Sequence, residues 1–168
     1  MPHRVRRFLV AATLAVAAPL TLVAQVTPAK GTFGAEVTSS SFDLLVPSAS
    51  LLWMATPNVA LVTSFTANTR DDFSSIGASV GLRRFVPRPG KLRPIIGGGV
   101  AVTNNTLDAP PNFSRRDTQF GVYGEFGAAW FFTPNLMLGS TGVVSVSGGD
   151  GGTSLAARLV RLHAGVFF

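Results

Sequence analysis

The feature that most constrains this chain is an alternation of apolar residues with small or polar ones, at a period of two, in segment after segment beyond residue 32. In residues 119–132 one parity holds Phe120, Val122, Phe126, Trp130 and Phe132, and the other holds Gly121, Tyr123, Glu125 and Gly127. Residues 160–168 repeat the split, with Val160, Leu162, Val166 and Phe168 set against Arg161, His163 and Gly165. Successive side chains of a β-strand point to opposite faces. The pattern therefore predicts an all-β chain.

Short proline-containing turns separate these segments. The tripeptide Thr-Pro-Asn occurs at 56–58 and again at 133–135, and each copy interrupts a long uncharged stretch. Proline beside asparagine favours a tight turn, so each stretch is predicted as two strands and not as a helix. A third short turn is expected at 86–90. More polar connections alternate with these turns, at 42–47, 69–73, 104–118 and 148–153, and the resulting even number of strands, eight, suits a closed antiparallel barrel.

The N-terminus has the layout of a secretory signal peptide. Arg4, Arg6 and Arg7 precede an alanine- and leucine-rich stretch without charges, residues 8–24, which ends in small residues. A membrane anchor and a buried helix are the alternatives, but Pro19 interrupts the stretch, which is short for a membrane-spanning helix and follows a basic segment. We expect residues 1–25 to direct export through the general secretory pathway and to be cleaved, and residues 26–168 to form one domain.

The charge and the metal-binding potential of the chain exclude several classes of protein. The net charge is +6, from 14 basic and 8 acidic residues. Removing the three arginines of the signal peptide leaves 11 basic and 8 acidic residues, a charge of +3. No basic run with interleaved aromatic residues remains, so we expect no nucleic-acid partner. With no cysteine and two histidines, a disulfide scaffold and a zinc finger are excluded, and we expect no metal and no cofactor.

The face of the barrel that carries the apolar residues decides whether such a barrel is soluble or lies in a membrane. The other parity carries the ionisable residues Glu36, Arg83, Arg93, Glu125, Arg161 and His163. A soluble barrel, such as a lipocalin-like one, would turn its apolar parity inward. In an outer-membrane barrel the apolar parity faces lipid, the lumen is polar, and aromatic residues gather at the interfaces. Because the aromatic residues here lie near strand ends, we predict an eight-stranded antiparallel up-and-down transmembrane β-barrel.

A resemblance to a known family follows from these features together. The signal peptide, the alternation of short turns with polar loops, and a final strand ending in Gly165-Val166-Phe167-Phe168 resemble the small eight-stranded outer-membrane barrels of the OmpA/OmpX type. The resemblance implies a monomeric, porin-like protein of the bacterial cell envelope that contacts outer-membrane lipid, including lipopolysaccharide. It also implies that Phe168 is the signal through which the barrel-assembly machinery reads the C-terminal strand.

Counting residues from the strand ends gives expected positions for the candidate site residues. With both termini in the periplasm, the short turns are periplasmic and the polar connections, of which 104–118 is the longest, face outward. We expect a lumen cluster of Glu36, Glu125 and Arg161, with Arg83, Arg93 and His163 nearer the periplasmic mouth. We expect Arg158 to face the outer lipid interface, near a lipopolysaccharide phosphate or snorkelling to water. Further contacts with the lipid interface are assigned to Trp130, Phe132 and Phe168.

Three functions are compatible with this pattern. The first is a non-enzymatic barrel with a structural or surface-interaction role, in which the lumen charges neutralise one another. The second is a small pore with a charged constriction, for which the inward glycines would leave room. The third is a lipid-modifying enzyme, which requires His163 beside a serine and an acid on a lipid-accessible surface. The lumen parity of His163 and the absence of a catalytic cluster favour the first.

Overall fold

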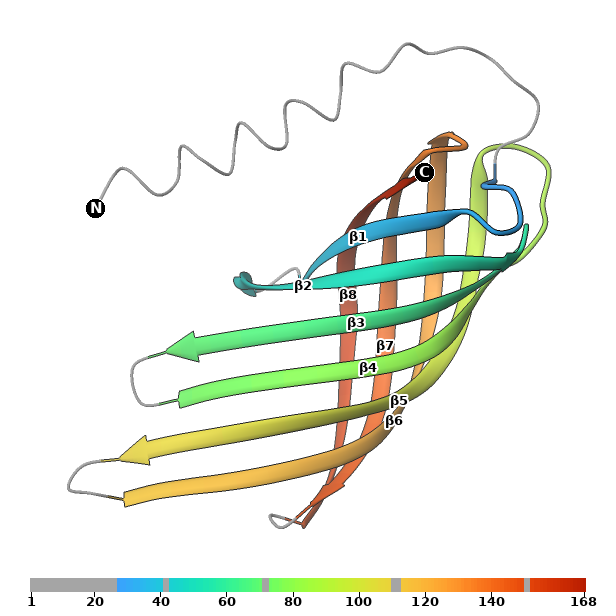
Figure 1. The fold of residues 1–168 in the computed structure, drawn as a ribbon. Helices are drawn as coiled ribbons and strands as arrows, with labels where there is room; N and C mark the ends of the chain where they lie inside the picture. Colours follow the sequence, from blue (N-terminus) through green and yellow to red (C-terminus); the bar gives the residue numbers. More distant parts are fainter. Residues whose placement is uncertain (1–26, 41–42, 71–72, 110–112, 150–151) are drawn as a thin grey trace, which may run out of the picture.

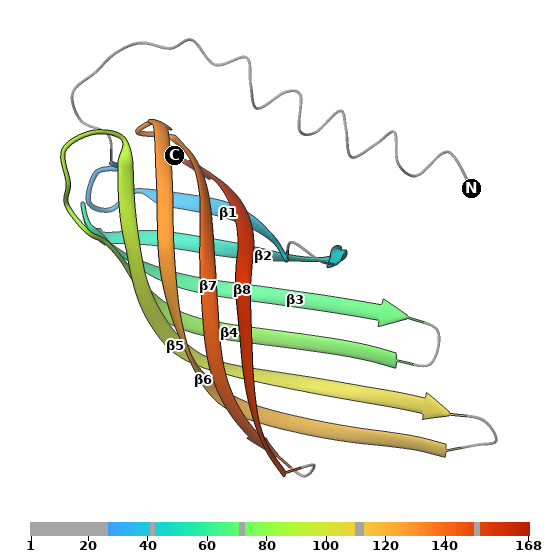
Figure 2. The same ribbon diagram turned by 180° about the vertical axis from the view of Figure 1, so that it is seen from behind.

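The computed structural model describes residues 27–40, 43–70, 73–109, 113–149 and 152–168. The expected signal peptide, residues 1–25, lies outside them. The described chain forms a closed barrel in which each strand pairs antiparallel with the next and the last pairs with the first (Figures 1 and 2). The strands are β1 Phe33–Ser40, β2 Asp43–Thr56, β3 Val59–Arg70, β4 Phe73–Phe85, β5 Leu92–Ala109, β6 Phe113–Thr133, β7 Leu136–Gly149 and β8 Gly152–Phe167. The predicted fold is confirmed.

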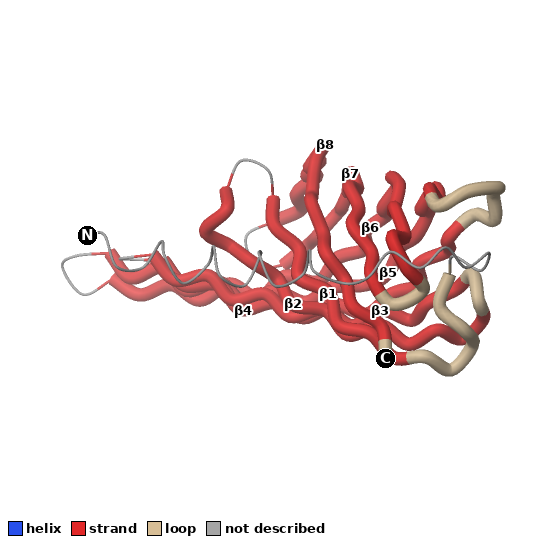
Figure 3. Tube along the Cα trace, turned by 90° about the horizontal axis from the view of Figure 1, so that it is seen from above, coloured by secondary structure: helices blue, strands red, loops and turns tan. Residues whose placement is uncertain are grey.

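The two Thr-Pro-Asn tripeptides form the same turn. The backbone N–H of Asn58 donates to Thr56 Oγ1 at 3.2 Å, and that of Asn135 donates to Thr133 Oγ1 at 3.2 Å. The connection at 86–91 contains Gly90, whose φ of 90° is disfavoured for residues with a side chain. The described loops gather at the end of the barrel that holds the C-terminus, here called the turn end (Figure 3). The opposite end is called the loop end.

The apolar parity points outward. Trp130, Leu162 and Val166 are 48%, 52% and 52% exposed, whereas Glu36, on the other parity, is 2% exposed. A soluble barrel would show the reverse, so the soluble alternative is contradicted. Within the described segments, no helix is long and apolar enough to cross a membrane.

The prediction of a long loop at 104–118 is wrong. Strands β5 and β6 continue through most of it and remain paired as far as Ala109 and Phe113. The sequence between Asn104 and Asp108 and between Phe113 and Thr118 contains no glycine or proline, so nothing interrupts the extended backbone. The stretch resembles a loop because its residues are mainly polar. The expected connection at 42–47 is likewise mostly strand, since β2 begins at Asp43.

One irregularity in the last strand changes which residues face inward. In β8, Arg161 pairs with Thr141 and Arg158 pairs with Val143, so two residues of β8 lie opposite Gly142 alone. This is a β-bulge, which shifts the alternation of the strand by one residue. On the turn side of the bulge the parity is as predicted, and on the loop side it is reversed.

Candidate functional site in the barrel interior

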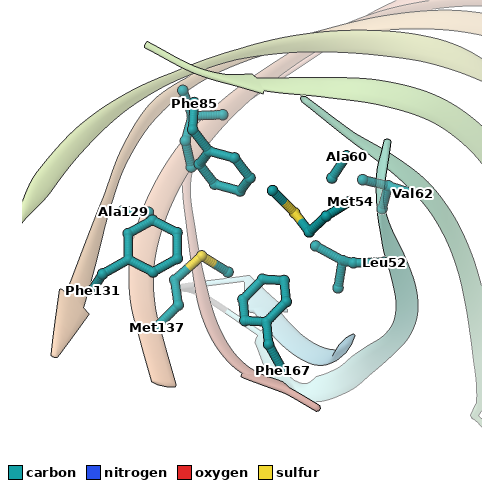
Figure 4. Packing of buried hydrophobic residues seen from close by; sticks show 10 residues of the cluster. Leu52, Met54, Ala60, Val62, Phe85, Ala129, Phe131, Met137 and Phe167 are labelled. Carbon is teal, nitrogen blue, oxygen red and sulfur yellow. The ribbon is translucent and has the colours of Figure 1, made fainter. Parts of the chain in front are cut away.

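The interior at the turn end is filled by an apolar plug. Its side chains converge from strands around the barrel (Figure 4). The rings of Phe85 and Phe131 meet edge to face at 5.4 Å between centroids, and Phe131 and Phe167 lie 6.2 Å apart. Phe85, Phe131, Met54 and Met137 have no exposed surface. The plug consists of Leu52, Met54, Ala60, Val62, Phe85, Ile95, Ala129, Phe131, Met137 and Phe167.

The three phenylalanines of the plug are tied to the turns by their backbones. The N–H of Phe85 donates to the carbonyl of Asn58 at 2.8 Å, and that of Phe167 donates to the carbonyl of Asn135 at 2.8 Å. The N–H of Phe131 donates to the carbonyl of Lys91 at 2.9 Å. Each of the three described connections therefore fixes one aromatic residue of the plug.

The plug was not predicted, because its residues share the parity of the polar lumen. The lumen parity changes from polar to apolar near the turn end of the strands, as in the step from Arg83 to Phe85. One signal could have revealed the change. In Phe131-Phe132 and Phe167-Phe168 two aromatic residues are adjacent, and in a strand one of each pair must point inward.

Above the plug lies a buried ion layer of Glu36, Arg83 and Glu125. Arg83 Nη1 donates to Glu36 Oε2 at 2.6 Å, Nε donates to Glu125 Oε1 at 2.7 Å, and Nη2 donates to Glu125 Oε2 at 3.1 Å. Arg83, Glu36 and Glu125 are 5%, 2% and 7% exposed. Paired N–H groups on one carboxylate form the strong bidentate arrangement. One guanidinium thus connects β1, β4 and β6 across the barrel.

The expected partner of the two acids was Arg161, and the structure assigns that role to Arg83. Strand register explains the difference, because Arg83 pairs with Gly97 and Gly97 pairs with Glu125, which places Arg83 and Glu125 in one row. Counting residues from strand ends ignores this stagger. Arg161 Nη2 donates instead to Ser48 Oγ, at 3.5 Å.

His163 lies inside the barrel beside the ion layer. It is 3% exposed, and its Nδ1 is 3.2 Å from Glu36 Oε2. Thr38 Oγ1 donates to the other oxygen of Glu36, also at 3.2 Å. A lipid-modifying site requires this histidine on a lipid-accessible surface, and the structure places it in the interior. No group of three or more His, Asp or Glu residues able to hold a metal ion occurs in the described part of the chain.

Two inward glycines are covered by the side chains of these ionisable residues. A Cβ at Gly97 would lie 2.6 Å from Glu125 Oε1, and a Cβ at Gly139 would overlap the ring of His163. The room that these glycines were expected to leave for a water path is therefore occupied. Arg93 is separate from the ion layer. It pairs with Ala129 of the plug, and its Nε is buried without a hydrogen-bond partner in the described structure.

On the loop side of the ion layer the lumen widens into a cavity of about 870 Å³, here called the polar cup. Glu36, Arg83 and Glu125 line its base, and Arg158 and Arg161 line its wall. Its other polar lining residues are mainly hydroxyl and amide side chains: Thr38, Ser48, Ser50, Ser64, Thr66, Asn68, Ser75, Ser79, Thr103, Asn105, Gln119, Tyr123, Ser145, Ser147 and Ser154.

The expectation that Arg158 faces lipid is wrong. Arg158 pairs with Val143, which is 9% exposed and lines the cup. Residues directly opposite each other on paired strands point to the same face of the sheet. The β-bulge is the physical reason, because it reverses the parity that alternation from Phe168 assigns to Arg158.

The aromatic residues assigned to the interface lie near the turn end. Trp130 points outward, and its ring centroid is 6.3 Å from that of Phe132. Phe168 is 74% exposed, and its backbone N–H and carbonyl both bond to Phe33. Contact of these residues with lipid stays a prediction.

Comparison with solved structures gives three similar barrels. The N-terminal β-barrel domain of Pseudomonas aeruginosa OprF matches with a TM-score of 0.63 and 19% identity, over 83% of this chain and 98% of that chain. Neisserial surface protein A matches with a TM-score of 0.51 and 17% identity, over 81% and 92%. Ail, the attachment invasion locus protein of Yersinia pestis, matches with a TM-score of 0.52 and 12% identity, over 82% and 94%.

All three are eight-stranded outer-membrane barrels. This chain has their fold. Comparison with protein-family models and with curated protein sequences gave no match. The likeness therefore establishes the architecture alone.

Proposed function

We propose that the chain is a monomeric integral barrel of a bacterial outer membrane, with a structural or surface-interaction role and no enzymatic activity. The observation that carries the proposal is the outward apolar face. Ile76, Ile96 and Phe120 are 69%, 60% and 67% exposed on three different strands. Soluble monomers rarely expose continuous apolar patches larger than a few hundred Å². A lipid bilayer is the solvent that such a surface requires, and a closed barrel leaves no unpaired strand edge within it.

The interior supports a barrel that does not conduct. A continuous water path would have to pass the ion layer and then the apolar plug. The plug rings pack against one another, and the Arg83 guanidinium is held from two sides by Glu36 and Glu125. No observation favours the pore, and the interior position of His163 gives no support to a lipid-modifying enzyme.

The orientation and assembly of the barrel form part of the proposal. We place the turn end in the periplasm and the loop end outside, with lipopolysaccharide and other outer-membrane lipid around the apolar face. Export would use residues 1–25 as a signal peptide. The exposed Phe168 at the end of β8 fits recognition by the barrel-assembly machinery. A role at the cell surface agrees with two of the similar barrels, which are a surface protein and an attachment invasion locus protein.

Outer-membrane fractionation followed by gel electrophoresis tests the proposal. We expect the chain in the outer-membrane fraction and a change of migration when the detergent extract is heated, because membrane barrels of this type stay folded in detergent until boiled. Recovery in the soluble periplasm would contradict the proposal. Planar-bilayer recording tests the closed interior separately. Reproducible conductance steps that change in an Arg83→Gln variant would show that the barrel is a pore and would contradict the structural role.

A further inference from the structure

Two guanidinium groups of the polar cup form no ion pair with any carboxylate of the described residues. Arg161 makes one long hydrogen bond, to Ser48 Oγ at 3.5 Å. Arg158 forms no ion pair with any residue in the described part of the chain, and the two acids at the base of the cup bind Arg83 instead. Two like charges on one face of a strand repel each other. The two acids at the base also attract Arg161, although neither forms an ion pair with it.

The β-bulge of β8 brings these two arginines to the same face. Residues 158 and 161 are three positions apart, so regular alternation would place them on opposite faces of the sheet. Because two residues of β8 lie opposite Gly142, Arg158 and Arg161 instead pair with the inward residues Val143 and Thr141. Bulges often re-aim a side chain beside a functional site. Here the effect is to concentrate positive charge in the wall of the cup.

The rest of the wall is suited to a hydroxylated ligand. Several of its hydroxyl groups bond to one another. Ser50 bonds to Ser64 at 2.8 Å, and Ser147 bonds to Ser154 at 2.8 Å and donates a longer bond, of 3.4 Å, to Gln119 Oε1. Such groups can exchange these bonds for bonds to a ligand, because each hydroxyl both donates and accepts. A volume of about 870 Å³ lies within the range of small-molecule sites. The ion layer gives the cup a fixed base.

We propose that the polar cup binds a small hydroxylated oxyanion, such as a phosphorylated sugar, that enters from the loop end. Arg158 and Arg161 bind the anionic group, and the serine and threonine hydroxyls of the wall bind the hydroxyl groups of the ligand. Guanidinium groups suit phosphate and carboxylate because their N–H groups match the oxyanion geometry. The inference goes beyond the structural role and does not depend on it, since the cup belongs to the barrel itself.

Calorimetric titration of the full barrel in nanodiscs of zwitterionic lipid tests the proposal, with glucose-6-phosphate as the probe. We expect saturable binding that weakens at least about tenfold in an Arg158→Gln, Arg161→Gln double variant, since the variant loses its hydrogen bonds from charged groups to the anion. The matched control is Arg84→Gln with Arg116→Gln, which removes the same charge from two exposed positions outside the cup and should leave binding unchanged.

Two other probes separate the anionic group from the hydroxyl groups. Glucose and inorganic phosphate should each bind at least about tenfold more weakly than glucose-6-phosphate. Equal binding of either one would overturn the proposal. So would the absence of saturable binding up to about 10 mM, or unchanged binding in the double variant.

A lipid source for the anion is tested in nanodiscs that contain lipopolysaccharide. We expect glucose-6-phosphate to bind as before, because the two arginines lie inside the barrel. Competition by lipopolysaccharide would assign the arginines to lipid phosphate and overturn the proposal. Heat-dependent gel migration verifies that the double variant is folded. The single variant Arg158→Gln changes one exposed position of the cup wall. It repeats the comparison with a smaller perturbation.

Discussion

Arg83 and Glu125 form a bidentate ion pair inside the barrel, with Arg83 Nε and Nη2 at 2.7 and 3.1 Å from the two carboxylate oxygens. The same guanidinium holds Glu36 at 2.6 Å. Its side chain thus connects three strands that are not neighbours in the sheet. Removing it leaves two buried carboxylates without a cation, which is far more costly than removing a pair at the surface.

Replacing Arg83 should therefore destabilise the barrel strongly. We expect Arg83→Met to lower the free energy of unfolding by about 3–5 kcal/mol, the usual loss when one partner of a buried ion pair is removed. Urea titration of the refolded barrel measures it. The neighbouring Arg84, which is exposed, provides the control, and Arg84→Met should change the stability by less than about 0.5 kcal/mol. Equal effects of the two substitutions would show that the ion layer is dispensable.

Gly97 should not tolerate a side chain. A Cβ there would lie 2.6 Å from Glu125 Oε1 and 2.7 Å from the carbonyl oxygen of Leu82. We expect Gly97→Ala to cost about 1–3 kcal/mol of unfolding free energy, as overpacking does. Gly148→Ala is the matched control, because the nearest atom to its Cβ is Thr153 Oγ1 at 3.9 Å. The prediction fails if Gly97→Ala is as stable as Gly148→Ala.

The plug should respond to truncation differently from the lipid face. We expect Phe131→Ala to lower the free energy of unfolding by about 3–5 kcal/mol, because removal of this buried ring leaves a cavity among its neighbours. Phe126→Ala, on the outward face, should cost clearly less, since lipid or detergent can fill the vacated space. Chemical unfolding of both variants in the same detergent gives the comparison. Similar losses would mean that the plug is loosely packed.

Cysteine labelling can verify that Arg158 faces inward. The chain has no cysteine, so Arg158→Cys and Leu155→Cys each introduce a single thiol. Leu155 is 75% exposed on the other parity of β8. We expect a lipid-phase quencher to reach a fluorophore on residue 155 and to leave one on residue 158 bright, whereas a water-soluble quencher should show the opposite preference. Lipid-phase quenching at residue 158 would restore the lipid-facing assignment.

Phe168 should matter for assembly more than for stability. Its side chain is 74% exposed, and its hydrogen bonds to Phe33 come from the backbone, so an alanine can retain them. We expect Phe168→Ala to reduce the folded fraction in outer membranes of expressing cells, while the variant refolded in detergent keeps nearly the stability of the parent. Normal insertion in cells would argue against the assembly-signal role.

Alternation and turn residues are sufficient to predict the strand number, the closure and the outward apolar face, because one buried or lipid-facing surface fixes the parity of every strand. They could not predict the partner of Glu36 and Glu125, which depends on the stagger between strands. They misplaced Arg158 because a bulge leaves no mark in the residue types around it. The length of the β5–β6 hairpin was underestimated, because strands with solvent on both faces need no alternation of apolar and polar residues.

The attachment of the plug to the turns has a consequence for the order of assembly. Asn58, Lys91 and Asn135 each directly precede a hairpin whose second strand carries one of the three aromatic rings at or near its end. Each of these three hairpins thus adds one aromatic ring to the plug when it closes. Because Phe167 belongs to β8, the plug is complete only after the final strand has paired with β1. The step that joins the two edges of the sheet therefore also closes the turn end of the lumen.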